Sequence, residues 1–237
     1  MSNTTTPGYK LKAIWNIYGS SIDISYSEMI TRNDRLIDEF FFVVLGGYGI
    51  SYEQNKSALE VLKKKGALEV ILYKDKIRLS STIEFLIREL SLAQFEPRSK
   101  TGQLRKYRFM ESKGKTLARA GNWLWGECKW DLIAKLHSLN PQKTRDWLCK
   151  CPGIGLKSAS WYLRNIGFNY DYAVFDVHVL KFLKQVGFDV PHLINNKSYI
   201  ELEQTLRDTC NNINVSLGAM DYLIWLLGRN NYTKYLR

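Results

Sequence analysis

Hydrophobic positions recur at helical spacing along most of the chain. Residues 34–45 form an apolar run that ends at Gly46, and apolar side chains in residues 52–64 fall on one helical face. The same pattern predicts further helices over residues 81–92, 116–126, 131–139, 143–150, 198–211 and 217–227. We expect residues 70–79 to form a turn between helices rather than a hairpin, and the fold class to be all-α.

Length and composition indicate a folded protein. The chain has 237 residues, of which 45% are hydrophobic and 13% aromatic, so it can bury a core and is not of the disordered class. We expect a mobile arm over residues 1–10 and a folded region over 11–237. The first residues lack the apolar segment of a signal peptide, and no apolar run approaches the ~18 residues that cross a bilayer. These features predict a cytoplasmic protein without a membrane partner.

The net charge of +11 favours a polyanionic partner, and nucleic acid is the first candidate. Basic residues are densest over residues 98–119, where they alternate with aromatic ones. This stretch is either a solvated connector or a strip that faces phosphates. In the second case Arg105, Lys106 and Arg108 are the candidate DNA contacts.

The cysteine pattern argues against a zinc site. Cys149 and Cys151 are separated by a single residue, which is too close for half of a C-x2-C zinc site, and no matching second pair exists. We expect buried, reduced thiols.

A glycine turn lies past the middle of the chain, where Pro152-Gly-Ile-Gly155 separates two amphipathic segments. This pattern predicts a helix–hairpin–helix over residues 148–167, in which Gly153 and Gly155 turn the chain and Lys157 opens the second helix. Free N–H groups and the helix dipole favour a phosphate at such a helix start. The carbonyls of Cys149, Cys151 and Ile154 are candidate ligands for a monovalent cation. Many ordinary helix pairs also turn on glycine, so the turn alone does not decide the function.

The run LCKCPGIGLKSASWYLRNIGFNYDYAVFDVHVLKFL resembles the helix–hairpin–helix DNA glycosylases, and most closely the compact, archaeal-type 8-oxoguanine DNA glycosylase/AP lyases. The resemblance implies two helical lobes with the active site in the cleft between them. We assign residues 98–190 to the lobe with the hairpin, and residues 11–97 and 191–237 to the other. Some enzymes of this fold carry an iron–sulfur cluster near the C-terminus on four cysteines. Only Cys210 follows the hairpin, so we expect no such cluster, and no cofactor beyond the hairpin cation.

The resemblance also implies roles for three residues. Lys157 corresponds to the lysine that attacks C1′ of the deoxyribose and forms a Schiff base; otherwise it is a surface lysine that touches phosphate. Asp176 corresponds to the acid that stabilises positive charge in the transition state, and it also stands where a helix N-cap is expected. His178 corresponds to a contact to the phosphate of the damaged nucleotide, with a capping or core histidine as the alternative.

The pocket for the flipped base is less clearly marked. Trp161 and Trp225 are candidate walls and Gly46 offers a backbone group, whereas core packing and a simple helix-end turn are the alternatives. The chain ends in Arg237, whereas the compact branch ends in lysine, and this difference leaves another modified base open as the substrate. From the hairpin, Lys157 and Asp176 together, the resemblance implies a glycosylase with AP lyase activity on duplex DNA, most simply on 8-oxoguanine, and no obligate protein partner. A glycosylase for a bulky, phage-type base that acts in phage defence and a non-catalytic DNA-binding module remain as alternatives.

Overall fold

Every regular element in the described residues, 6–21 and 29–229 of this computed structural model, is helical. Within those ranges the one β-type pairing is an isolated antiparallel bridge between Phe95 and Arg105. The all-α prediction is therefore confirmed. Residues 70–79 contain two short 3₁₀ helices, Val70–Leu72 and Lys76–Arg78, in keeping with the turn expected there.

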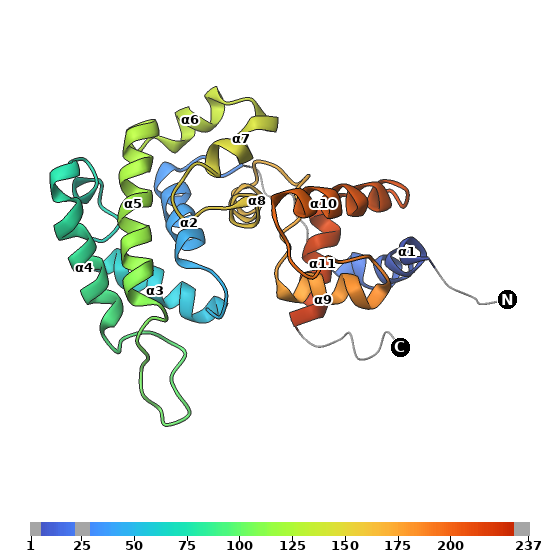
Figure 1. Cartoon of the computed structure of the whole chain (residues 1–237), viewed down its shortest axis with the longest axis horizontal. Helices are drawn as coiled ribbons and strands as arrows, with labels where there is room; N and C mark the ends of the chain where they lie inside the picture. The colour runs from blue at the N-terminus through green and yellow to red at the C-terminus, as the bar shows by residue number, and fades with distance from the viewer. Residues whose placement is uncertain (1–5, 22–28, 230–237) are drawn as a thin grey trace. The chain divides into compact units, whose positions relative to one another are not determined.

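The chain divides into two compact units (Figure 1), residues 30–162 and residues 1–29 with 163–237. We call the first the hairpin unit and the second the terminal unit. The hairpin unit contains α2 (Asn33–Leu45), α3 (Tyr52–Lys64), α4 (Leu79–Ser91), α5 (Met110–Cys128), α6 (Leu132–Ser138), α7 (Pro141–Leu148) and the start of α8 (Leu156–Asn165). The terminal unit contains α1 (Pro7–Tyr18), the 3₁₀ helix Gly19–Ser21, the end of α8, α9 (Val177–Val186), α10 (Asn196–Asn211) and α11 (Leu217–Arg229).

These units differ from the lobes expected from the sequence. The units are divided at residues 29–30 and 162–163, whereas the sequence-based expectation keeps residues 98–190 in one lobe. The reason is packing, because α4 pairs with α5 in one unit and α9 pairs with α11 in the other. Residues 7–10 of the expected arm form the first turn of α1, with Thr6 as its N-cap, while residues 1–5 lie outside the described residues.

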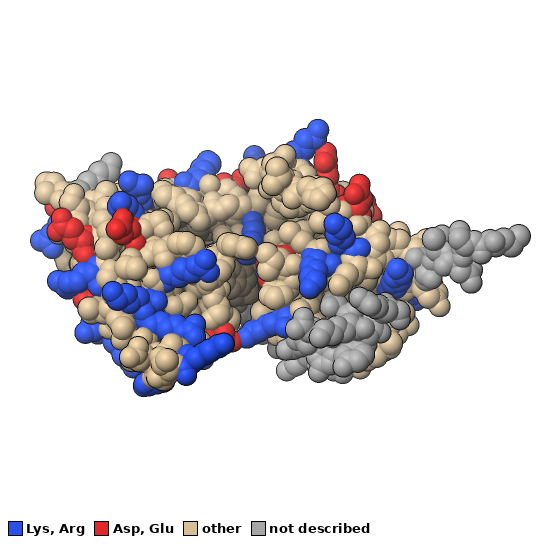
Figure 2. All heavy atoms as spheres, turned by 60° about the horizontal axis from the view of Figure 1, so that its bottom comes forward, with Lys and Arg blue, Asp and Glu red and all other residues tan. Residues whose placement is uncertain are grey.

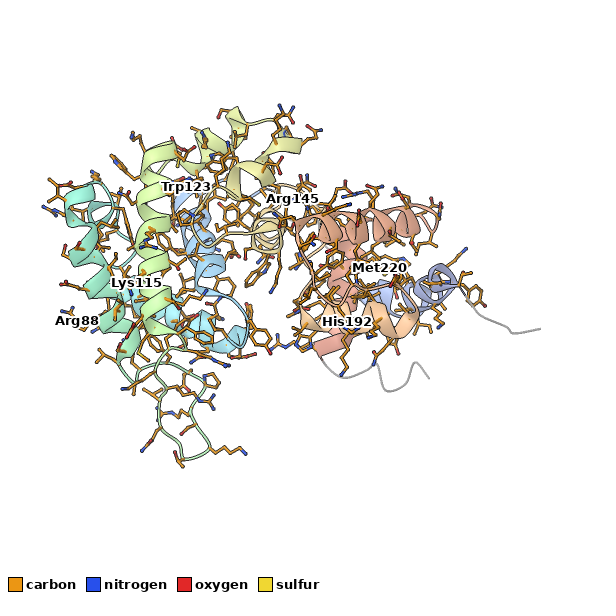
Figure 3. All side chains as sticks on the ribbon, in the orientation of Figure 1. Arg88, Lys115, Trp123, Arg145, His192 and Met220 are labelled. Carbon is orange, nitrogen blue, oxygen red and sulfur yellow. The ribbon has the colours of Figure 1, made fainter. Side chains whose placement is uncertain are left out.

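Aromatic side chains form the centre of the hairpin unit. Trp123, labelled in Figure 3, extends from α5 and stacks on Phe40 of α2 at a centroid distance of 6.4 Å. Its ring also contacts that of Trp147 of α7 at 5.0 Å. Phe40 in turn meets Tyr162 of α8 edge to face. The start of α8 is thereby fixed on the core of this unit.

The connection between α4 and α5 projects beyond the ends of both helices (Figure 1). Lys and Arg side chains gather on this part of the surface (Figure 2). The exposed basic residues of the loop are Arg98, Lys100, Arg105, Lys106 and Arg108. Among the helices that the structure describes, none is both long and apolar enough to cross a membrane.

Candidate functional site

The hairpin turn separates α7 from α8 as the sequence predicts, and its two glycines are under different constraints. Gly153 has φ 85°, and a Cβ built on it would lie 2.2 Å from Cγ2 of Thr116, so the fold itself requires glycine there. A Cβ on Gly155 would meet open space among the described residues. The fold would therefore accept a side chain at Gly155, and glycine there suits the close approach of an outside molecule.

Two alanine substitutions are expected to separate these constraints. Gly153→Ala should lower the free energy of unfolding by about 1–3 kcal/mol, because it imposes a left-handed backbone and a clash on a non-glycine residue. Gly155→Ala should leave chemical denaturation curves unchanged and weaken binding to a DNA duplex severalfold. Equal destabilisation by both variants, or unchanged DNA affinity of Gly155→Ala, would contradict this assignment.

Lys157 lies in the first turn of α8, as predicted, and is partly exposed, while Ala159 and Tyr162 are buried in the core. A second amine, that of Lys113 on α5, lies close enough for the two charges to interact. Burial and, to a smaller extent, the positive charge of Lys157 lower the pKa of Lys113 to about 8. The sequence alone does not mark Lys113, because within the basic stretch nothing distinguishes this lysine from its neighbours.

The Lys113 amine holds the turn that follows α2. Its Nζ donates to the carbonyl of Val44 at 2.9 Å and to that of Gly46. A Cβ on Gly46 would lie 2.8 Å from Cζ3 of Trp161, so glycine is needed for the tryptophan ring to pack here. The structure therefore brings together three of the features of interest in the hairpin unit, namely the Gly46 turn, Trp161 and the pair of amines.

Trp161 has aromatic neighbours as well. Its ring meets that of Phe42 at a centroid distance of 5.4 Å, and Phe42 meets Tyr52 of α3 at 5.6 Å. Trp161 is nevertheless only partly buried, so part of the residue stays accessible to solvent. This arrangement is compatible with both readings of Trp161, as a packing residue and as a pocket wall.

Asp176 and His178 lie in the terminal unit. Asp176 is the N-cap of α9, and its Oδ1 accepts from the backbone N–H of His178 at 2.8 Å and of Val179 at 2.9 Å. The N-cap expectation is confirmed. The His178 side chain is exposed, as a phosphate contact requires.

The second candidate tryptophan, Trp225, lies on α11 in the terminal unit, where its ring stacks on that of Tyr222. The Arg229 guanidinium lies over the Trp225 ring, 5.2 Å from its centroid. Trp225 is partly buried. The chain end beyond it, residues 230–237, lies outside the described residues, and so does the difference at Arg237.

Asp221 of α11 was missed by the sequence analysis and is fully buried. It forms an ion pair with Arg164 at the end of α8, and its Oδ1 accepts from the N–H of Val174 at 3.0 Å. Burial raises the pKa of Asp221 to about 6, Arg164 acts in the opposite direction, and the charge of Asp176 raises it further. A signal was present in the sequence, because this acid interrupts an otherwise apolar helix.

The basic residues of the α4–α5 loop are partly engaged in the fold. The Arg105 guanidinium donates to the carbonyl of Arg98 at 3.0 Å, and that of Arg108 donates to the carbonyl of Gly49 at 3.0 Å and covers the Phe109 ring. The Lys106 side chain is exposed. Each of the three predicted residues thus presents charge at the surface, and two of them also brace loops.

Metal-type ligands do not cluster in the part of the chain that the structure describes. No group of three or more His, Cys, Asp or Glu side chains there has an arrangement that could hold a metal ion. Cys128, Cys149, Cys151 and Cys210 are free thiols. At the hairpin, the Cys151 carbonyl accepts from the N–H of Ile154 at 3.1 Å, and a cation on this carbonyl stays a prediction.

Comparisons with known proteins agree with this architecture. Residues 49–215 match a family model described as 8-oxoguanine DNA glycosylase. The 8-oxoguanine DNA glycosylase/AP lyase of Saccharolobus islandicus (strain Y.N.15.51 / Yellowstone #2) is 35% identical over 133 residues, which cover 54% of this chain and 63% of that protein. The protein of that name from Sulfurisphaera tokodaii is 29% identical over 153 residues, which cover 64% of this chain and 74% of that protein.

Solved structures share the fold at lower identity. The 8-oxoguanine DNA glycosylase of Methanocaldococcus jannaschii superposes with a TM-score of 0.65 at 23% identity, covering 93% of this chain and 92% of that one. The glycosylase/lyase of the same organism, in complex with a 15mer DNA containing 8-oxoguanine, gives a TM-score of 0.66 at 21% identity, covering 94% and 97%. At these identities the structures establish the helical architecture alone.

Proposed function

The chain belongs to the helix–hairpin–helix family of 8-oxoguanine DNA glycosylases, and on this basis we propose that it excises 8-oxoguanine from duplex DNA and cleaves the strand at the resulting abasic site. The observation that carries the proposal is the extent of the family match, which includes both the hairpin with Lys157 and the helix start at Asp176. The 133 residues aligned with the first curated relative span 63% of the length of that protein.

Lys157 is the nucleophile in this proposal. The lone pair of its neutral Nζ attacks C1′ of the flipped nucleotide, the C1′–N9 bond breaks, and the base leaves with the bonding electrons and takes up a proton. The amine then loses its proton and the sugar ring opens, which gives a Schiff base. Loss of a proton from C2′ expels the 3′ phosphate by β-elimination, and water finally releases the lysine. The position of Lys157 suits this step, because the residue is partly exposed in the first turn of α8, where a bound nucleotide can meet its amine.

Asp176 stabilises the positive charge that develops at C1′ in this proposal. Its Oδ1 is used by the α9 cap, so Oδ2 is the oxygen offered to the sugar. His178, in the first turn of α9, contacts the phosphate of the damaged nucleotide in this proposal. The cap and the catalytic role are compatible, since each uses a different oxygen.

The remaining candidates bind DNA. The hairpin N–H groups at Gly153 and Gly155 hold a phosphate, with a monovalent cation on the carbonyls of Cys149, Cys151 and Ile154. Arg105, Lys106 and Arg108 contact phosphates farther along the duplex. Gly46 and Trp161 of the hairpin unit, and separately Trp225 of the terminal unit, are the proposed contacts to the flipped base.

The substrate is tested by incubating the protein with duplexes that each contain one modified base and detecting the released base by mass spectrometry. We expect free 8-oxoguanine and a cleaved strand. Release of a bulkier base instead would assign the enzyme to that base and to defence rather than repair. Binding to every duplex without product would leave a non-catalytic DNA-binding module.

A further inference from the structure

The segment that leads into Asp176 is held by buried acids from two other helices of the terminal unit. The N–H of Ala173 donates to Oε1 of Glu203 on α10 at 3.0 Å. The N–H of Val174 donates to Oδ1 of Asp221 on α11 at 3.0 Å. Both carboxylates are buried, so these bonds form in surroundings where an unmet polar group is costly.

A tyrosine hydroxyl completes this arrangement. Tyr199 on α10 donates to the carbonyl of Ala173 at 2.6 Å and accepts from the N–H of Phe175 at 3.4 Å. Its ring packs on that of Phe175 at a centroid distance of 4.8 Å. One oxygen atom thus bridges two backbone groups directly before Asp176.

Arginines fix the two acids in turn. Arg164 pairs with Asp221, and Arg207 lies 3.5 Å from Oε2 of Glu203. Arg207 also binds the Asp171 carboxylate and donates to the Asp171 carbonyl at 2.8 Å. The buried side chains of Tyr199, Glu203 and Asp221, which we call the polar frame, therefore hold the backbone of residues 173–175. This segment has no helix or sheet of its own to satisfy its backbone groups.

We propose that Tyr199, Glu203 and Asp221 are positioning residues, which fix the carboxylate of Asp176 by holding the backbone of residues 173–175. This inference rests on the function proposed above and adds to it the residues that set the geometry of the acid. A carboxylate that stabilises charge must be held near the sugar, because misplacement of about 1 Å can cost on the order of a hundredfold in rate. The α9 cap orients the side chain of Asp176, and the frame fixes the backbone from which it extends.

Tyr199→Phe tests the proposal, because it removes the bridging oxygen and keeps the ring. We expect single-turnover release of 8-oxoguanine to slow by about 10- to 100-fold with the Kd for the duplex unchanged. In an Asp176→Asn background the same substitution should cause no further loss, since the residue acts through Asp176. Tyr9→Phe is the matched control, because that tyrosine of α1 in the same unit is 66% exposed.

Amide hydrogen exchange separates this proposal from the proposed function. We expect the Phe175 amide to exchange at least about tenfold faster in Tyr199→Phe than in the wild type. A wild type that releases no base from any duplex would overturn the proposed function, and the exchange result would still judge the frame. Unchanged exchange at Phe175, an unchanged excision rate, or an equal loss in the Asp176→Asn background would overturn the positioning role.

Discussion

Lys157→Ala is expected to abolish the covalent adduct that borohydride traps between the protein and DNA containing an abasic site or 8-oxoguanine. Without the amine no Schiff base forms, so strand cleavage should disappear and base release should fall by about a thousandfold or more. Lys157 is partly exposed in the first turn of α8, and its replacement should leave the melting temperature nearly unchanged. Trapping is measured by the mobility shift of the labelled strand on a denaturing gel.

Peptide mapping of the wild-type adduct identifies the reacting lysine directly. Trypsin should yield residues 151–164 with the sugar attached and uncut at Lys157, since that peptide contains no other lysine. Attachment to residues 109–115 would instead make Lys113 the nucleophile. Lys64→Ala, which changes an exposed lysine at the end of α3, should trap as the wild type does.

The spacing of hydrophobic residues was sufficient to predict most helices. It was insufficient for the start of α5, where a glycine inside the helix is required for packing. The helix expected over 34–45 is α2, Asn33–Leu45, and that expected over 52–64 is α3. The helix expected over 116–126 is the much longer α5. Its first turns contain Gly114, which lowers helix propensity, but a Cβ there would lie 2.6 Å from Cγ1 of Ile87 on α4. Glycine is needed for α4 and α5 to approach, and a local pattern carries no record of a distant helix.

The residues of the candidate site also fall into those that local sequence predicts and those that it does not. The hairpin turn and the N-cap at Asp176 were predictable, because each depends on a few neighbouring residues with a specific backbone requirement. The roles of Lys113, Tyr199 and Glu203 were not predictable, because each of these side chains bonds to backbone groups at least 24 residues away in the sequence. A polar side chain on a helix gives no sign of which distant carbonyl or N–H it will meet.

Asp176→Asn is expected to lower single-turnover base release by about 100- to 1000-fold while DNA affinity stays the same, because it removes the negative charge that opposes the developing charge at C1′. The substitution is close to isosteric, and asparagine is as good an N-cap as aspartate. The Asn side-chain oxygen can keep the bonds from the N–H groups of His178 and Val179, so the free energy of unfolding should change little. Quenched-flow measurement of base release and equilibrium binding of the same duplex give the two quantities.

Asp176→Ala separates the cap from the charge. This variant loses both, so we expect the rate loss of Asp176→Asn together with about 1 kcal/mol less stability in chemical denaturation. If both variants were destabilised and slowed in proportion, the aspartate would serve the fold and the rate loss would be indirect. If Asp176→Asn released base at the wild-type rate, the carboxylate would have no part in the chemistry, and the stabilising charge would have to come from another group. A rate loss in Asp176→Asn with full stability is the one result that makes the charge itself, rather than the helix start it caps, the reason for an acid at this position.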